Sequence, residues 1–107
     1  KKPLNDAIRY DPKHSDAWYQ RGLLYLDFGR VEEAKSDFEA AAKHDTKHID
    51  ARLRIAAILH EGEDANAAVT AWRKVLDIDP EHRLARRRLQ ESSDRQKTIK
   101  VRVPPKD

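Results

Sequence analysis

Apolar side chains recur along the chain at the spacing of amphipathic helices, and the pattern returns after 34 residues. Between residues 31 and 44, the positions Ala34, Phe38, Ala41 and Ala42 follow the i, i+4, i+7, i+8 order of one helix face. One period later, the matching positions are Ala68, Trp72, Val75 and Leu76. Before residue 98 the chain has none of the alternation of apolar and polar residues that is typical of a strand. The pattern therefore predicts a succession of helices.

Three similar tetrapeptides mark the same period. Residues 11–14, 45–48 and 79–82 each begin with aspartate and end with histidine, and they lie 34 residues apart. An alanine follows each of them at the same offset, namely Ala17, Ala51 and Ala85. A period of this length is that of a helix–turn–helix unit, which stacks on its neighbours to form a solenoid.

The residues at fixed places in the two full units resemble those of the tetratricopeptide repeat family. The first unit, residues 15–48, carries Trp18, Gly22, Tyr25, Ala34, Phe38 and Ala41 at the family's spacing. The second unit, residues 49–82, carries Ala56, Leu59, Ala68, Trp72, Val75 and Pro80. It departs from the family at Arg52, which stands where a tryptophan is usual. The resemblance is specific for the fold and leaves the function open, because such repeats are scaffolds.

The resemblance implies an all-α, right-handed helix–turn–helix solenoid over residues 1–95. Two full repeats, 15–48 and 49–82, follow the truncated end of an earlier repeat at residues 4–14. A polar capping helix is expected over residues 83–95, because the last helix has no neighbour to cover its outer face. Residues 96–107 are expected to form a basic extended tail, either a linker or a strand that adds to a partner's sheet.

Two local predictions concern the helices and their turns. Arg21 and Asp37 match a familiar variant of the family and are predicted to pair across the two helices of the first unit. In the alternative, the arginine stem packs on the surface and its charged end lies in water. Gly29 precedes Ala34 by five residues, whereas Gly62 precedes Ala68 by six. The first helix of the second unit is therefore expected to stop about one residue sooner than its counterpart.

Composition adds that the basic excess belongs to the end of the chain. The 107 residues suit a single domain, with 22 basic and 19 acidic side chains. Residues 1–82 hold 13 basic and 16 acidic residues, whereas residues 83–107 hold 9 basic and 3 acidic ones. No apolar run reaches the length of a membrane span. The chain starts without methionine and is expected to be a piece of a longer protein, with the cytoplasm favoured over a periplasmic or secretory compartment.

Little in the sequence suggests catalysis, a metal site or a cofactor. Cysteine is absent, which removes disulfides, thiolate ligands and cysteine nucleophiles. The recurring histidines at 14, 48 and 82 would lie about 8–10 Å apart in stacked helices, too far to share a zinc ion that needs ligands within about 2.1 Å. Helix capping is the expected role. With three glycines and no clustered nucleophile and base, no enzyme activity and no cofactor are predicted. Trp18 and Trp72 are expected to pack between helices.

The concave surface, lined by the first helix of each unit, is the candidate binding site that the resemblance implies. The first unit contributes Asp16, Tyr19, Gln20, Leu23, Leu26 and Asp27. The second contributes Asp50, Leu53, Arg54, Ala57, His60 and Glu61. The capping helix contributes Leu84, Arg87, Arg88 and Glu91. The expected partner is a protein or peptide with apolar anchors and some acidic character. The alternative is self-association through the terminal helices, where Leu4, Ala7 and Ile8 form an apolar face. Nucleic acid and membranes are not expected partners.

Overall fold

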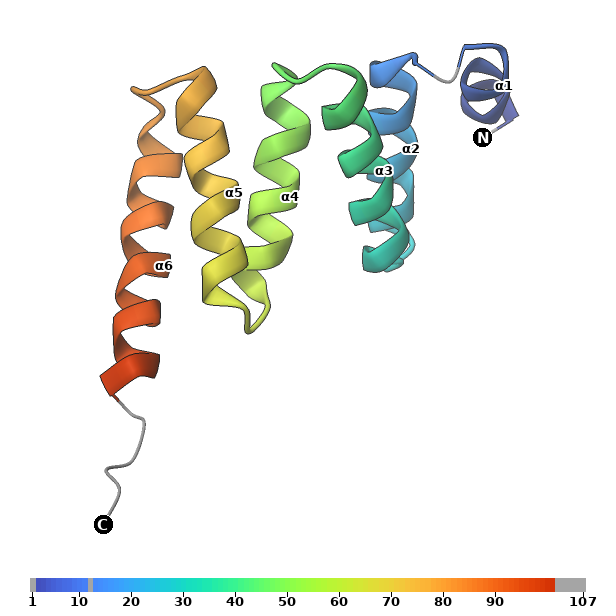
Figure 1. Cartoon of the computed structure of the whole chain (residues 1–107). Helices are drawn as coiled ribbons and strands as arrows, with labels where there is room; N and C mark the ends of the chain where they lie inside the picture. Colours follow the sequence, from blue (N-terminus) through green and yellow to red (C-terminus); the bar gives the residue numbers. More distant parts are fainter. Residues whose placement is uncertain (1, 12, 102–107) are drawn as a thin grey trace.

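A computed structural model describes residues 2–11 and 13–101, and these residues form six helices and no strand (Figure 1). The helices are α1 (Lys2–Tyr10), α2 (Ser15–Asp27), α3 (Val31–His44), α4 (Ile49–Glu61), α5 (Ala65–Ile78) and α6 (Arg83–Val101). Helices that follow one another in the chain pack against one another from α1 to α6. The predicted all-α helical solenoid is thereby confirmed. In Figure 1, α1 is seen nearly end-on, whereas the axes of α2 to α6 run roughly from top to bottom of the picture.

The repeated tetrapeptides form turns that start the first helix of each unit. In each, the aspartate Oδ1 accepts a hydrogen bond from the backbone two residues on, at 3.1, 3.1 and 3.2 Å. The histidine Nδ1 then accepts the backbone N–H of the alanine three residues later, at 3.2, 3.1 and 3.2 Å. An N-cap satisfies one of the free N–H groups at a helix start. The capping role predicted for His14, His48 and His82 is confirmed.

Small residues let the helices of the core approach one another closely. Phe38 and Trp72, the large apolar residues at one repeat position, are 0% and 2% exposed. The alanines around them, among them Ala34, Ala56 and Ala68, are fully buried. Gly22 faces Phe38 so closely that a Cβ atom there would lie 2.6 Å from Phe38 Cε1. A side chain at this position would have to displace a buried ring, so glycine is required by the approach of α2 to α3.

The expectation that the first helix of the second unit stops sooner is wrong. α2 ends at Asp27 and α4 ends at Glu61, which are equivalent positions one period apart. The two turns have the same length and take different backbone routes. Gly29 has a φ of +76°, a left-handed conformation that favours glycine. Gly62 stands one place earlier and is extended, with φ −84° and ψ −167°. The shifted glycine therefore changes the conformation of the turn and leaves the helix end in place.

The capping helix also differs from its expected length. α6 continues to Val101, beyond the predicted boundary at residue 95, so residues 96–101 are helical and not an extended tail. The side chains of Arg95 and Gln96 hold this end of the helix by hydrogen bonds to α4, its following turn and α5. The strand-like alternation that begins at Thr98 does not end the helix before Val101. Residues 102–107 lie outside the described part of the chain. Among the described helices, none combines the length and the apolar character needed to cross a bilayer.

Candidate functional site

A shallow hollow of about 260 Å³ lies where α2, α4 and α6 face the same side of the stack. Its described lining residues are Tyr19, Asp50, Leu53, Arg54, Ala57, Trp72 and Leu84. Six of the seven were predicted as groove residues. Each of the three helices that were predicted to line the groove, α2, α4 and α6, supplies at least one lining residue. Residues at 50, 53, 54 and 57 share one face of α4 because they lie three or four positions apart. We call this cavity the concave hollow.

Tilted contacts between aromatic rings form one wall of the concave hollow. The Tyr19 ring lies 5.6 Å from the ring of Phe38 and 4.9 Å from the ring of His48, measured between centroids. His48 Nδ1 accepts the Ala51 N–H, which places the ring proton on Nε2, and Nε2 lies 3.5 Å from an oxygen of Asp16. His48, the N-cap residue of α4, therefore also packs against Tyr19, the side chain of α2 that lines the hollow.

Apolar side chains and one cation make up the opposite wall. Leu84 is exposed to 44% although it is aliphatic, and Ala57 is exposed as well. Leu53 packs partly on the core around Trp72. Arg54 is exposed and has no ion-pair partner among the described residues. The combination offers an apolar contact surface beside an unpaired positive charge, with Asp50 as the nearest acid in sequence.

Trp72 is the lining residue that sequence analysis did not assign to the site. It was predicted to pack in the core, and it is buried there against the edge of His60, with ring centroids 6.0 Å apart. One side of it also borders the concave hollow. Its buried Nε1–H has no acceptor among the described residues. A residue of the second helix was missed because the family's groove is described by its first helices.

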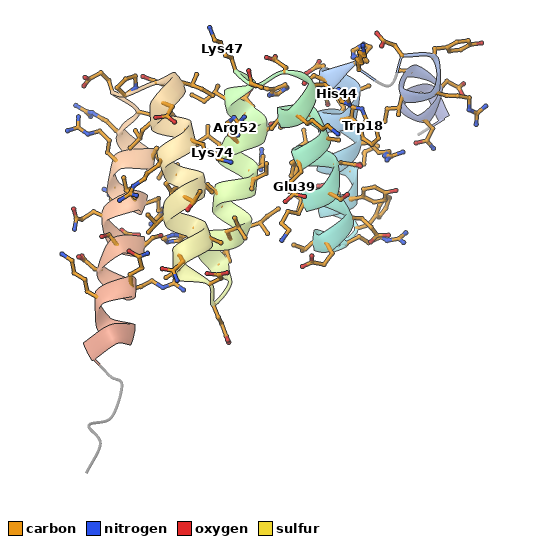
Figure 2. The ribbon with its side chains drawn as sticks, viewed as in Figure 1. Trp18, Glu39, His44, Lys47, Arg52 and Lys74 are labelled. Carbon is orange, nitrogen blue, oxygen red and sulfur yellow. The ribbon has the colours of Figure 1, made fainter. Side chains whose placement is uncertain are left out.

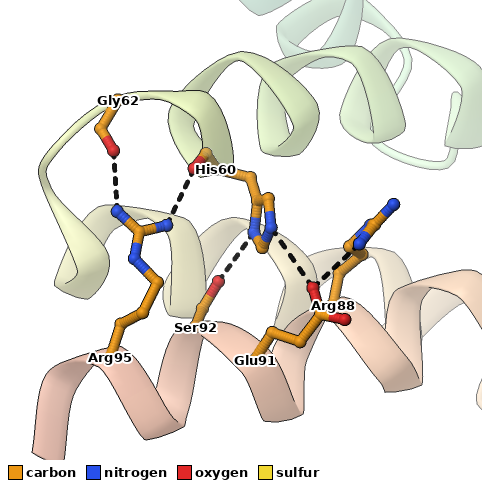
Figure 3. A network of polar contacts seen from close by, with 6 residues as sticks. All are labelled: His60, Gly62, Arg88, Glu91, Ser92 and Arg95. Carbon is orange, nitrogen blue, oxygen red and sulfur yellow. Dashed lines mark hydrogen bonds and ion pairs between the residues drawn. The ribbon is translucent and has the colours of Figure 1, made fainter. Parts of the chain in front are cut away.

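Three other predicted groove residues contact one another (Figure 3). His60 Nε2 lies 3.4 Å from Glu91, and Arg88 donates to the same carboxylate at 2.8 Å. The hydrogen bond from Arg88 is the main cause that lowers the pKa of Glu91. Glu91 therefore stays ionised until the pH falls below the usual range of glutamate, and its ion pair is lost as the pH falls further. These residues join α4 to α6 and are not part of the hollow's lining.

Two residues outside the predicted set complete this network. Ser92 is fully buried, and its Oγ lies 3.0 Å from His60 Nδ1. Arg95 donates to the backbone carbonyls of His60 and Gly62, both at 2.8 Å. These carbonyls belong to the C-terminal end of α4, where intrahelical partners are missing. The contacts span more than 30 positions in sequence, so no local pattern could reveal them.

The remaining predicted groove residues do not line the concave hollow. Leu23 and Leu26 are half-buried in α2, and five polar residues are exposed outside the hollow's lining, namely Asp16, Gln20, Asp27, Glu61 and Arg87. Among the residues that the structure describes, no three histidine or acidic side chains come close enough to hold a metal ion.

Replacing Arg95 by alanine is expected to lower the free energy of unfolding by about 1.5 kcal/mol, because two charge-assisted hydrogen bonds to α4 are lost. Urea unfolding followed by circular dichroism measures the change. Arg86→Ala is the control on the same helix, since its exposed contact with Glu81 spans 3.4 Å. The control should change stability by less than about 0.5 kcal/mol. Equal losses in both variants would contradict the anchoring role.

Comparisons with known proteins agree with the geometry. Two sequence models described as tetratricopeptide repeat match residues 4–36 and 50–82. A TPR repeat-containing protein of Rhizobium etli is 30% identical over 82 residues, covering 77% of this chain and 40% of that protein. The peroxisomal targeting signal receptor of Komagataella phaffii is 34% identical over 76 residues, covering 70% and 12%. Anaphase-promoting complex subunit 3 of Schizosaccharomyces pombe is 29% identical over 86 residues, covering 80% and 13%. The chain thus spans less than half the length of each relative.

Proposed function

The chain belongs to the tetratricopeptide repeat family, and we propose from this premise that its concave hollow binds a segment of a partner protein without catalysing a reaction. The observation that carries the proposal is the meeting of exposed apolar side chains and an unpaired arginine in one hollow. Arg54, Ala57 and Leu84 are exposed to solvent, so a bound segment could contact them. The repeats and the relatives support the broader role as a protein-interaction module.

The lining specifies the chemistry of the bound segment. Leu53, Ala57 and Leu84 favour an apolar anchor, because burying its surface is favourable by about 25 cal/mol per Å². Arg54 favours a carboxylate beside that anchor. The proposed ligand is therefore a peptide with apolar anchors and some acidic character.

The names of the relatives point in the same direction. One is called a receptor for a peroxisomal targeting signal, and another is called a subunit of the anaphase-promoting complex. Recognition of a protein signal and membership of a complex are both protein-binding roles. These names describe those proteins, and their particular partners are not carried over to this chain.

Selection from a displayed library of random peptides tests the proposal, followed by calorimetric titration of the peptides recovered. Ala57→Glu places a bulky charge inside the concave hollow and is expected to weaken binding at least about tenfold. Ser36→Glu is the control, because Ser36 is exposed on α3 and lies outside both this hollow and the larger one described below. Retained binding in Ala57→Glu, or a selection that recovers no peptide, would reject the concave hollow as the site.

Self-association through the terminal helices is the alternative function and has less support. Ile8 belongs to the apolar face that was expected to mediate self-association. It is only 9% exposed because α1 packs on α2, so little of this side chain is left for a second copy to contact. The side chain of Leu4 lies outside the described set. Light-scattering mass over a hundredfold dilution separates the two functions: a constant monomer mass is expected. A mass that rises with concentration would favour the self-associating scaffold instead.

A further inference from the structure

A larger hollow, of about 630 Å³, lies on the opposite face of α4 from the concave one. Its α4 residues are Arg52, Ile55 and Leu59, which point about half a helical turn away from Leu53 and Ala57. Its walls are α3 and α5. The remaining described lining residues are Glu39, Ala42, Lys43, Thr46, Ala67, Thr70, Ala71 and Lys74. We call this cavity the convex hollow.

Comparison of the two repeats explains why the convex hollow exists. At an offset of 34 residues, Arg21 and Asp37 of the first unit correspond to Ile55 and Ala71 of the second. In the first unit the Arg21–Asp37 ion pair occupies this cleft, and the guanidinium carbon lies 5.2 Å from the ring centroid of Trp18. The hollow left beside that pair measures about 230 Å³. Smaller apolar side chains in the second unit leave the wider cleft open.

The position of Arg52 adds to the opening. It replaces the tryptophan of the first unit, Trp18, whose ring stacks on His44 with centroids 6.5 Å apart. Arg52 Nε instead donates to the backbone oxygen of Thr46 at 2.9 Å, so the arginine lies along the turn before α4. The floor of the hollow is consequently aliphatic, made by Ile55 and Leu59 and by alanines of α3 and α5.

The rim of the convex hollow is basic. Lys43, Arg52 and Lys74 have no carboxylate partner among the described residues, and Glu39 is the only acid among the described lining residues. Figure 2 shows Glu39, Arg52 and Lys74 on one face of the stack. An occupant must therefore offer negative charge for the rim and aliphatic surface for the floor. Like charges across an interface would oppose binding.

These features select one kind of occupant. The basic end of this chain, with Lys97, Lys100, Arg102 and Lys106 against Asp107, is repelled by the rim. A nucleic acid would find cations and no aromatic ring to stack on, and it would leave the apolar floor uncovered. We infer that the convex hollow is a second binding site, which takes an acidic segment of a partner protein through inserted aliphatic side chains. Its α4 and α5 walls each span about two helical turns, or about 10 Å.

A synthetic probe tests this inference with the whole chain. The probe is a fluorescein-labelled helical peptide of about three turns, with leucines along one face and glutamates elsewhere. Fluorescence anisotropy is expected to give saturable binding, and Lys74→Glu should weaken it at least about tenfold. Arg73→Glu is the matched control, since Arg73 is also an exposed cation on α5 and lines neither hollow among the described lining residues. It should change the affinity less than about twofold. Circular dichroism checks that both variants stay folded.

Matched peptides decide between the alternatives. A peptide with lysine in place of glutamate, and one with serine in place of leucine, should both bind at least about tenfold less tightly. No binding of the acidic probe, or equal binding of the lysine peptide, would overturn the inference. A loss seen in Ala57→Glu and not in Lys74→Glu would place the probe in the concave hollow and would also overturn it. Since the concave hollow is proposed to take a peptide of the same character, the effect of Lys74→Glu is also measured in the Ala57→Glu background, where the concave hollow is blocked and only the convex hollow is left to bind the probe.

Discussion

Replacing Phe38 by alanine is expected to lower the free energy of unfolding by about 3–5 kcal/mol, the usual cost of removing a buried aromatic ring. Phe38 has no exposed surface and meets both the backbone of Gly22 and the ring of Tyr19. The glycine cannot fill the space that the ring leaves, so a cavity remains between α2 and α3. A typical domain is stable by only about 5–15 kcal/mol. This one substitution should therefore remove a large part of the protein's stability.

Phe28→Ala is the matched control for this experiment. The same two residue types are exchanged, yet Phe28 is 70% exposed in the turn after α2. Its replacement should change the free energy of unfolding by less than about 0.5 kcal/mol. Urea unfolding followed by circular dichroism compares the two variants at equal protein concentration. Similar losses would show that Phe38 is not the centre of the interface between α2 and α3.

The second large effect is expected at Asp37, where alanine should cost about 3 kcal/mol. Arg21 donates to both carboxylate oxygens of Asp37, at 2.8 and 3.0 Å, so the predicted pair is confirmed. Asp37 is 3% exposed, and removing it would strand the guanidinium between two helices. Breaking a buried pair from one side costs about 3–5 kcal/mol. The lower end applies because Arg21 keeps a quarter of its side chain in solvent.

The second repeat supplies the control for the pair. The double variant Arg21→Ile, Asp37→Ala copies the residues Ile55 and Ala71, which occupy the same places one period later. Its loss should be at least about 1 kcal/mol smaller than that of Asp37→Ala alone, because no charge is left without a partner. Urea unfolding of the two single variants and the double variant completes the cycle. A double variant as unstable as the sum of its parts would show that the two residues do not interact.

The pH dependence of this pair follows from the arginine. The hydrogen bond to Asp37 raises the pKa of Arg21 above its ordinary value, against the effect of burial. A group whose folded pKa is raised contributes stability that is present below its unfolded pKa and is lost as the pH rises through the folded pKa. The contribution of Arg21 is therefore constant around neutral pH and is lost only in strongly alkaline solution.

The two repeats share a fold and differ in what fills their clefts. In the first unit, the bidentate pair and the rings of Trp18 and Tyr25 occupy the convex side of α2. In the second unit, aliphatic residues and a displaced Arg52 leave the convex side of α4 open. Equivalent helices thus offer a filled surface in the first unit and a hollow in the second. Differences between repeats, more than the repeat itself, are the basis of the second binding site inferred above.

Sequence reasoning succeeded wherever the deciding contacts are local or periodic. The tetrapeptide turns and histidine caps join residues two or three positions apart, and apolar spacing fixed the buried faces of α3 and α5. The predicted concave set included six of the residues that line the hollow. It also included His60 and Glu91, which instead bond across helices. The position of Gly62 predicts that α4 ends about one residue sooner than α2. This prediction is wrong because an extended glycine at position 62 makes a turn of the same length.

By itself, the sequence determined the helices, their caps, the 34-residue period and the family, because each depends on neighbours along one helix or on a pattern that recurs. Only the tertiary structure decided the length of α6, the network around His60 and the sizes of the two hollows. Arg95 joins α6 to carbonyls that lie 33 and 35 positions away. A cavity is the space left after side chains from three or four helices have packed. Its volume depends on the packing of all these side chains together, so it cannot be predicted from any one segment of the sequence.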